Sequence, residues 1–389
     1  MGWIPSLWTT AQAVLSVFVL GVASTAGLLY RYQRSLVYPS NFPQGSRTDV
    51  LTPDHFGIPY EDLRLTTPDG ETLHAFLMPQ KTASEKEKAR GENLDPDETV
   101  KRRPTILFLH ANAGNMGHRL PLASVFYKRF GCNVLMLSYR GYGLSTGQPS
   151  EQGIRIDAQT ALDWIRKHEA LQKTVIVAYG QSIGGAVAVD LVSRNTKSIY
   201  ALILENTFLS IPELIPHVLP PVRPFAFLCR EYWPTGESIK LIPKTTPILF
   251  LSGRMDELVP PSHMDALLAR CASDVKVWKS FAEGTHNDTC VKHGYFESIG
   301  LFLTTFIKDE KLDALRIIET GQGTSSRSRS HSGSRAKLAR SASTGSSSSS
   351  DARRRKTTAA TAQGERTHDS DAKWVEMSAK DAETAGPLT

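Results

Sequence analysis

The hydrophobic pattern from Pro104 onward alternates between short apolar runs and longer segments with helical periodicity. The runs have the length and composition of buried strands. Strands that alternate with helices predict a mostly parallel sheet with helices on both faces. The predicted strands are Thr105–Leu109, Asn133–Leu137, Thr174–Ala178, Tyr200–Leu204, Pro247–Leu251 and Val275–Phe281, and the predicted helices are Pro121–Phe130, Glu151–His168, Gly184–Ser193, Ser262–Ala272 and Lys292–Ile307.

Upstream of this region the pattern predicts a β-hairpin followed by an insertion. Glu61–Thr67 and Thr72–Met78 read as two strands joined by the turn Pro68-Asp69-Gly70. The charged stretch from Lys81 to Arg103 has no apolar periodicity. We therefore expect residues 81–103 to form a charged surface insertion or a disordered loop.

Two further segments depart from the alternation. Residues 206–243 are rich in proline and aromatic residues, so they are too broken for one regular helix and are predicted to form a cap over the sheet. Residues 311–389 lack apolar periodicity and contain Ser/Arg mixtures and a serine run. We expect an α/β domain over 51–310, followed by a disordered Ser/Arg-rich tail whose protein partners the sequence does not identify.

The N-terminus contains an uncharged apolar run over residues 11–30, preceded by a short segment, 1–10. A helix of this length spans a hydrocarbon core, and Trp3, Trp8 and Tyr30 suit the membrane interfaces. A cleaved signal peptide is the alternative, with Ser24-Thr25-Ala26 as its cleavage site. No basic residue precedes the run, which favours a single transmembrane helix.

The flanking residues also predict an orientation. Arg31 and Arg34 follow the run, while no Lys or Arg precedes it, so the positive-inside rule favours a cytosolic location of the large C-terminal part, at an endomembrane or the plasma membrane. Met1-Gly2 with Ser6 also fits a myristoylation pattern, although bulky Trp3 and Pro5 make it a poor match.

Composition and charge argue against several classes of function. The net charge is +6, but the 69 residues from Gly321 hold 12 Lys plus Arg against 7 Asp plus Glu, so nearly all the excess lies in the tail and nucleic-acid binding is not expected. The four cysteines form no CxxC pair or metal-ligand spacing. Tyr139–Ser145 contains G-x-G but lacks the third glycine of a dinucleotide-binding motif, so we expect no cofactor. No cluster of metal-ligating residues stands out in the sequence, so we also expect no metal.

The chemistry-bearing motif is Gly180-Gln181-Ser182-Ile183-Gly184, which follows a predicted strand and opens a predicted helix. A G-x-S-x-G sequence in this context predicts a nucleophilic Ser182 on a sharp turn. The small residues on either side allow the turn to close. The backbone N–H of Ile183 at the start of the helix is then expected to stabilise an oxyanion.

A serine nucleophile requires a histidine base and an orienting acid, which follow the serine in this order: acid, then histidine. Asp256 lies just after the strand Pro247–Leu251, where catalytic groups gather in such sheets. Glu257, Asp274 and Glu205 are its rivals.

His286 lies in the glycine-containing loop after the last predicted strand and is favoured as the base. His263 and His293 are alternatives, but they lie within or beside helical segments. The second oxyanion donor is expected from the loop after Thr105–Leu109, with the N–H of Asn112 favoured over Ala113. His110 is expected to organise that loop.

Taken together, these motifs resemble the membrane-anchored α/β-hydrolases of the bud-emergence-suppressor type and similar animal α/β-hydrolase-domain proteins. The resemblance extends from about Leu51 to Ile307 and includes the N-terminal anchor; its motifs are His110–Asn115, Tyr139–Ser145, Gly180–Gly185, Glu205–Phe208, Gly253–Pro260 and Gly284–Asn287. It implies a Ser182, Asp256 and His286 triad, and relatives that remove palmitoyl groups from proteins or act on lipids. The chain departs from the family at Ala111, where glycine is more usual, and a methyl group there is tolerated unless that residue requires a positive φ.

We therefore predict a membrane-anchored serine hydrolase that cleaves an ester or thioester of a hydrophobic acyl substrate. The alternative is a catalytically weak hydrolase-fold scaffold at a membrane, with the tail recruiting partners.

Overall fold

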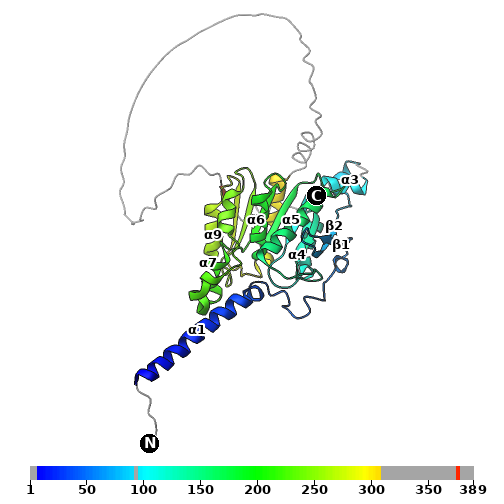
Figure 1. Ribbon diagram of the computed structural model, residues 1–389. Helices are drawn as coiled ribbons and strands as arrows, with labels where there is room; N and C mark the ends of the chain where they lie inside the picture. Colours follow the sequence, from blue (N-terminus) through cyan, green and yellow to red (C-terminus); the bar gives the residue numbers. More distant parts are fainter. Residues whose placement is uncertain (1–6, 92–94, 308–373, 377–389) are drawn as a thin grey trace, which may run out of the picture. The chain divides into compact units, whose positions relative to one another are not determined.

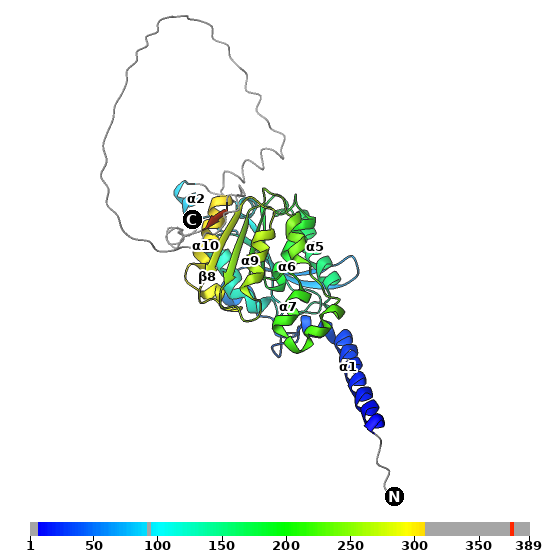
Figure 2. The same cartoon turned by 90° about the vertical axis from the view of Figure 1, so that its left-hand side faces the viewer.

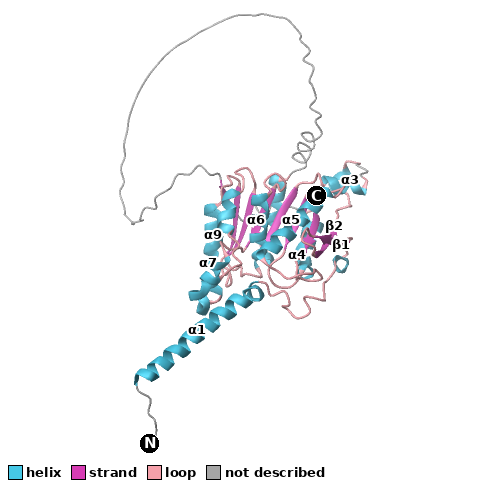
Figure 3. Cartoon of the chain, in the orientation of Figure 1, coloured by secondary structure: helices cyan, strands magenta, loops and turns pink. Residues whose placement is uncertain are grey.

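The computed structural model describes residues 7–91, 95–307 and 374–376, which form a nine-stranded sheet with helices on both faces (Figures 1 and 3). The strand order is β1-β2-β4-β3-β5-β6-β7-β8-β9. The strands are β1 Glu61–Thr66, β2 Thr72–Met78, β3 Thr105–Leu109, β4 Asn133–Leu137, β5 Ile176–Gln181, β6 Ala201–Glu205, β7 Ile248–Gly253, β8 Lys276–Phe281 and β9 Trp374–Glu376.

The sheet is antiparallel at the β1 edge and parallel from β4 onward. β1 and β2 form the predicted hairpin, in which Thr66 pairs with Thr72, and β2 pairs antiparallel with β4. The pairs from β4–β3 to β8–β9 are all parallel. The prediction of a mostly parallel sheet is confirmed, with each predicted strand from Thr105–Leu109 to Val275–Phe281 present within three residues of its expected bounds.

Helices cover both faces of the sheet. α5 (Glu151–Lys167), α6 (Ile183–Arg194) and α9 (Pro261–Arg270) contribute to one apolar core, while α4 (Leu120–Lys128) and α10 (Tyr295–Phe306) contribute to the other. Figure 2 shows the sheet between α10 on one side and α6 and α9 on the other. The helices are those predicted, with their ends shifted by up to three residues.

Successive side chains along each central strand point alternately into the two cores. In β3, Leu107 and Leu109 lie in the core with α5 and α6, whereas Ile106 and Phe108 lie in the core with α4 and α10. Successive residues of a strand point to opposite faces, so a strand covered on both sides must be apolar throughout. This is why β3 and its neighbours are continuous apolar runs.

The N-terminal helix α1 spans Leu7–Val37, so it is longer at both ends than the predicted 11–30. Among the described residues, it is the one helix long and apolar enough to cross a membrane, and its apolar window is unburied. Its last turns contact the 3-10 helix η3 (Pro220–Leu228). The apolar N-terminal helix therefore continues without a break to the folded domain.

The segment predicted as a cap consists of several short helices. α7 (Ile211–Val218) begins at Ser210, whose hydroxyl accepts a hydrogen bond from the Glu213 N–H, and η3 follows at once. α8 (Thr235–Ser238) and η4 (Ile239–Leu241) complete the segment. Pro216 and Pro224 lie inside α7 and η3, consistent with a chain that changes direction repeatedly.

The charged insertion differs from the prediction. The sequence analysis expected residues 81–103 to be a surface insertion or disordered loop, whereas the structure has α2 (Glu85–Ala89) and α3 (Pro96–Arg102). α3 begins with Asp95 as N-cap and proline as its first residue, a helix-start signal that the sequence analysis overlooked. It is held to the sheet because Asn133 Nδ2 donates to the Val100 carbonyl at 3.0 Å.

The predicted Ser/Arg-rich tail, 311–389, lies outside the described residues except for Trp374–Glu376. These residues form β9, which pairs in parallel with β8. The sequence analysis did not predict this strand.

Candidate active site

The turn between β5 and α6 holds Ser182 in an unusual backbone conformation, with φ 55° and ψ −123°. A positive φ is costly for a residue with a side chain, and it persists only where the surroundings enforce it. Here the two glycines of the motif permit the close contacts. A Cβ on Gly180 would lie 2.2 Å from the Gly184 carbonyl oxygen, and one on Gly184 would lie 2.1 Å from that of Leu109. Larger residues at either position would open the turn.

Hydrogen bonds to neighbouring elements hold the backbone of Ser182. Its N–H donates to the carbonyl of Glu205 at 2.9 Å, and the Thr207 hydroxyl donates to its carbonyl at 2.7 Å. Both partners belong to the end of β6 and the residues after it. The strained turn is therefore tied to the adjacent strand, and Ser182 is buried except for the face on the pocket.

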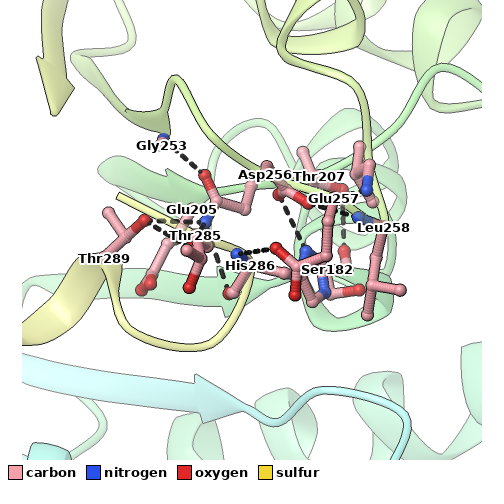
Figure 4. A network of polar contacts seen from close by, with 12 residues as sticks. Ser182, Glu205, Thr207, Gly253, Asp256, Glu257, Leu258, Thr285, His286 and Thr289 are labelled. Atoms are coloured by element: carbon pink, nitrogen blue, oxygen red, sulfur yellow. Dashed lines mark hydrogen bonds and ion pairs between the residues drawn. The ribbon is translucent and has the colours of Figure 1, made fainter. Parts of the chain in front are cut away.

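Asp256 and His286 come from the loops after β7 and β8 and meet beside Ser182 (Figure 4). His286 Nδ1 lies 2.8 Å from Asp256 Oδ2. The other carboxylate oxygen, Oδ1, accepts hydrogen bonds from the N–H groups of Leu258 at 2.9 Å and Val259 at 2.7 Å. Both side chains are buried. The carboxylate is thus held by two backbone donors with one oxygen directed at the imidazole ring.

The loop that carries His286 is held by Glu257, one of the rival acids, and by Gln181 of the nucleophile motif. Glu257 Oε2 accepts a hydrogen bond from the His286 N–H at 3.2 Å, and Gln181 Nε2 donates to the His286 carbonyl at 3.2 Å. Gln181 directly precedes Ser182, so the nucleophile turn and the histidine loop are joined.

Asn206 connects the two loops that carry Asp256 and His286. Its Oδ1 accepts the Gly253 N–H at 2.8 Å, and its Nδ2 donates to the Thr289 hydroxyl at 3.0 Å and the Thr285 carbonyl at 3.2 Å. Asn206 itself has φ 44°. In the sequence, Asn206 was marked by its position directly after a predicted strand and by the Glu205–Phe208 motif of the resemblance, neither of which indicated this role.

The rival acids and bases have other partners. Glu205 contacts Tyr179, Tyr295 and Gln181 rather than His286. His263 Nδ1 accepts the Leu209 N–H at 3.2 Å, and His293 is exposed. The structure brings together Ser182, Asp256 and His286 and leaves these alternatives outside that arrangement; Asp274 lies before β8, at the opposite end of the strand from His286.

Glu205 is nevertheless an unusual group, because its carboxyl is fully buried beneath the serine turn. Burial raises its pKa, while hydrogen bonds from the hydroxyls of Tyr179 and Tyr295 act in the opposite direction. Burial and the nearby Glu205 carboxyl also raise the pKa of both tyrosines well above its ordinary value. Two neutral hydroxyl donors therefore saturate one oxygen of this carboxyl.

The loop after β3 brings Asn112 into the pocket that also contains Ser182, Ile183 and His286. The Asn112 carbonyl accepts the hydroxyl of Tyr142 at 2.9 Å, which orients the loop. Ala111 is not one of the non-glycine residues with positive φ in the part of the chain that the structure describes, so its methyl group introduces no backbone strain.

His110, at the end of β3, is buried and contributes to the packing of this loop. Its Nδ1–H donates to the Ala111 carbonyl at 2.7 Å, and its ring lies 4.2 Å from that of Tyr139 and 5.1 Å from that of Tyr142. Burial lowers the pKa of His110 to about 4, so the ring is neutral near neutral pH. The turn Tyr139–Ser145 packs against the His110 ring. Within this turn, Arg140 Nε donates a hydrogen bond to the Asp157 carboxylate.

The pocket above Ser182 contains about 1040 Å³ of open space, including the part continuous with solvent. Its polar lining residues are Gln33, Asn112, Ser182 and His286, and the others are apolar. Within residues 7–91, 95–307 and 374–376, no three His, Cys, Asp or Glu side chains gather in a group that could hold a metal ion. The arrangement can therefore place an apolar ligand beside Ser182 and His286.

Comparisons with known proteins agree with this architecture. A family model described as the alpha/beta hydrolase fold matches residues 104–225. Protein bem46 of Schizosaccharomyces pombe is 50% identical over 290 residues, which is 73% of this chain and 91% of that protein. The uncharacterized membrane protein YNL320W of Saccharomyces cerevisiae is 39% identical over 297 residues, 76% of this chain and 98% of that protein.

Among solved structures, the esterase Pf2001 of Pyrococcus furiosus has a TM-score of 0.53 at 18% identity, covering 67% of this chain and 95% of that one. Such a likeness shows the fold. The relative that is half identical to the chain shows the family: the chain belongs to the bem46-like α/β-hydrolases. The resemblance found in the sequence is confirmed, and the family and the fold support a hydrolase.

Proposed function

We propose that the protein is a membrane-anchored serine hydrolase that cleaves an ester or thioester of a hydrophobic acyl group through Ser182, His286 and Asp256. The observation that carries this proposal is the 2.8 Å contact between Asp256 and His286 in a pocket that also contains the strained Ser182. Acid and base come from loops after two successive strands, and both side chains are buried.

The first step is formation of an acyl-enzyme. Asp256 accepts the Nδ1–H of His286, which leaves Nε2 as the free acceptor for the Ser182 hydroxyl proton. Ser182 Oγ then attacks the carbonyl carbon, the Nε2 of His286 takes the proton, and a tetrahedral oxyanion forms. The imidazolium returns this proton to the leaving alcohol or thiol as the C–O or C–S bond breaks.

The oxyanion is stabilised by the backbone N–H groups of Ile183 and Asn112. Ile183 is the first residue of α6, where backbone N–H groups are unpaired and the helix dipole favours negative charge. Asn112 lines the same pocket as Ile183. Loss of one such donor costs about 10²–10³-fold in kcat in related chemistry.

In the second step, water hydrolyses the acyl-enzyme. His286 takes one proton from the water molecule, whose oxygen attacks the acyl carbon of the ester formed with Ser182. A second tetrahedral oxyanion collapses, the bond to Ser182 Oγ breaks, and His286 returns the proton to Oγ. The products are the free acid and the regenerated serine.

The helix α1 and the pocket support the proposed substrate class and location. α1 is a candidate membrane span, and a related yeast protein is named as a membrane protein. Arg31 and Arg34 after the apolar run favour a cytosolic domain. The chain's single sequon, Asn287-Asp288-Thr289, adjoins His286, where a glycan would obstruct the pocket, and this also favours the cytosol. The apolar lining favours a lipid or acyl-protein substrate.

The test is labelling of the detergent-extracted full chain by a fluorophosphonate probe, with wild type and Ser182→Ala side by side. We expect the wild type to be labelled and the variant to be unlabelled, because the probe reacts with an activated serine hydroxyl. If neither protein is labelled while both remain folded, the hydrolase proposal fails and the membrane scaffold becomes the better explanation.

A further inference from the structure

One wall of the pocket above Ser182 is formed by the N-terminal helix rather than by the hydrolase domain. The last turns of α1 contribute four lining residues: Leu29, Gln33, Leu36 and Val37. The cap contributes the facing wall from α7 and η3, including Leu214, Val222 and Phe225. A helix that served only as a tether would have no reason to line the pocket of the nucleophile.

Polar contacts fasten this part of α1 to the cap. The buried Glu231 carboxylate accepts hydrogen bonds from Arg34 Nε at 2.8 Å and from the Tyr38 hydroxyl at 2.8 Å. Trp233 Nε1 donates to the Tyr38 hydroxyl at 2.9 Å. Gln33 Oε1 accepts the Arg230 N–H at 2.6 Å. The two walls are therefore joined along the side of the helix that faces the cap.

Helix geometry indicates the depth at which this wall of the pocket lies relative to a bilayer. The apolar run over 11–30 matches the hydrocarbon thickness, so Leu29 lies at the edge of that region. Val37 is seven residues beyond Tyr30, about 10 Å further along a helix. The headgroup layer is roughly 5–7 Å deep on each side. The wall thus extends from the hydrocarbon edge through the headgroups.

The rim of the pocket on the cap has the chemistry of a bilayer-contacting surface. Apolar side chains are exposed there, including Val218, Leu219 and Phe227, the last with 80% of its surface accessible. Arg223 and Arg230 are exposed beside them, and the Arg230 guanidinium lies 5.2 Å from the ring centroid of Tyr30 on α1. Apolar side chains flanked by arginines and tyrosines suit acyl chains and lipid phosphates at one interface.

We propose that the end of α1 and the cap form an acyl-chain channel that opens into the lipid bilayer, so that the hydrophobic chain of the substrate reaches Ser182 from within the membrane. This inference rests on the proposed hydrolysis at Ser182 and adds the route and the binding site of the acyl chain. The bilayer is the partner of the exposed rim because α1, whose apolar residues are unburied, leaves the domain beside η3.

The first test narrows the channel from the α1 side. The full chain is reconstituted in phosphatidylcholine vesicles and assayed with p-nitrophenyl palmitate and p-nitrophenyl acetate. Leu29→Trp should lower the palmitate-to-acetate rate ratio at least about tenfold, because Leu29 lines the pocket. Leu28→Trp is the matched control: Leu28 is next to it on α1, 59% exposed and not part of the lining, so the ratio should stay within about twofold of wild type.

Fluorophosphonate labelling of the same preparations separates the two proposals. An unlabelled wild type overturns the hydrolysis itself, and the channel with it. A labelled wild type in which Leu29→Trp leaves the ratio unchanged, or in which Leu28→Trp lowers it equally, overturns the channel alone.

The second test concerns the rim. Phe227→Asp should slow hydrolysis of vesicle-embedded palmitate ester at least about fivefold relative to the same ester in detergent micelles, because a carboxylate at this position opposes contact with the bilayer. Leu241→Asp is the control, since Leu241 is 67% exposed on η4 and does not line the pocket. Equal losses in vesicles and micelles for Phe227→Asp, or equal behaviour of the two variants, would show that the chain does not arrive from the membrane.

Discussion

Two buried carboxyls at the ends of neighbouring strands flank Ser182, and they have opposite surroundings. Asp256, after β7, has one oxygen held by two backbone N–H groups and the other directed at His286. Glu205, the last residue of β6, has one oxygen enclosed by the hydroxyls of Tyr179 and Tyr295. The carboxyl that meets an imidazole is placed to orient that ring, and the one that meets tyrosines is suited to supporting the fold.

The difference shows that nearness to the nucleophile does not by itself assign a catalytic role. Glu205 is connected to Ser182 through its backbone carbonyl and to the histidine loop only through Gln181, which lies 3.4 Å from Glu205 Oε1 and 3.2 Å from the His286 carbonyl. Under the proposed mechanism, Asp256 orients the imidazole of His286, while Glu205 holds in position the elements that carry the site.

The largest expected effect is a difference in catalytic activity between variants of Asp256 and variants of Glu205. Asp256→Asn should lower kcat about 10³–10⁴-fold, because the amide N–H₂ facing Nδ1 selects the imidazole tautomer that cannot accept the serine proton. Its Oδ1 can still accept the N–H groups of Leu258 and Val259, so the fold should persist. Glu205→Gln should lower kcat less than about tenfold. Steady-state hydrolysis of a soluble ester measures both, and similar losses in the two variants would remove the proposed distinction.

The second effect concerns stability, for which the larger loss is expected in the Glu205 variant rather than in the Asp256 variant. Glu205→Ala should lower the free energy of unfolding by about 2–4 kcal/mol, because it leaves two buried tyrosine hydroxyls without their acceptor and creates a cavity. Asp256→Asn should cost less, since its backbone donors keep a partner. Denaturant unfolding in detergent micelles, followed by tryptophan fluorescence, gives both values. A larger loss for Asp256→Asn would contradict the structural role given to Glu205.

The smallest effect is a dependence of stability on pH that arises at His110. Burial lowers the pKa of His110 to about 4, against about 6.5 when unfolded. Between these values the unfolded chain binds a proton that the folded chain does not, so the His110 contribution is complete above pH 6.5 and decreases as pH falls towards 4. At pH 5 the loss is about 2 kcal/mol.

His110→Asn provides the comparison that isolates this group, because other titrations are common to both proteins. The difference in unfolding free energy between wild type and variant should shrink by about 2 kcal/mol from pH 7.5 to pH 5. A constant difference across this range would mean that His110 is protonated in the folded protein or does not titrate there.

Much of the fold was predictable because its signals are local. The apolar runs of the central strands, the hairpin at Pro68-Asp69-Gly70 and the glycines around Ser182 depend on periodicity or on nearby residues. The interpretation of residues 81–103 was incomplete for a related reason: net polarity obscured the Asp95-Pro96 helix start and the buried Thr99 and Val100 of α3. β9 joins the sheet from a segment far along the chain, which no local pattern indicates.

The sequence by itself determined the strand–helix alternation, the family and the identity and order of the candidate nucleophile, acid and base. Only the tertiary structure decided which carboxyl faces His286, because Asp256 follows β7, Glu205 ends the neighbouring strand β6, and they differ in the groups that the folded chain brings to them. It also decided that α1 lines the pocket. Apolar periodicity shows that a helix prefers an apolar environment, but contacts between residues some 200 positions apart depend on how the whole chain packs.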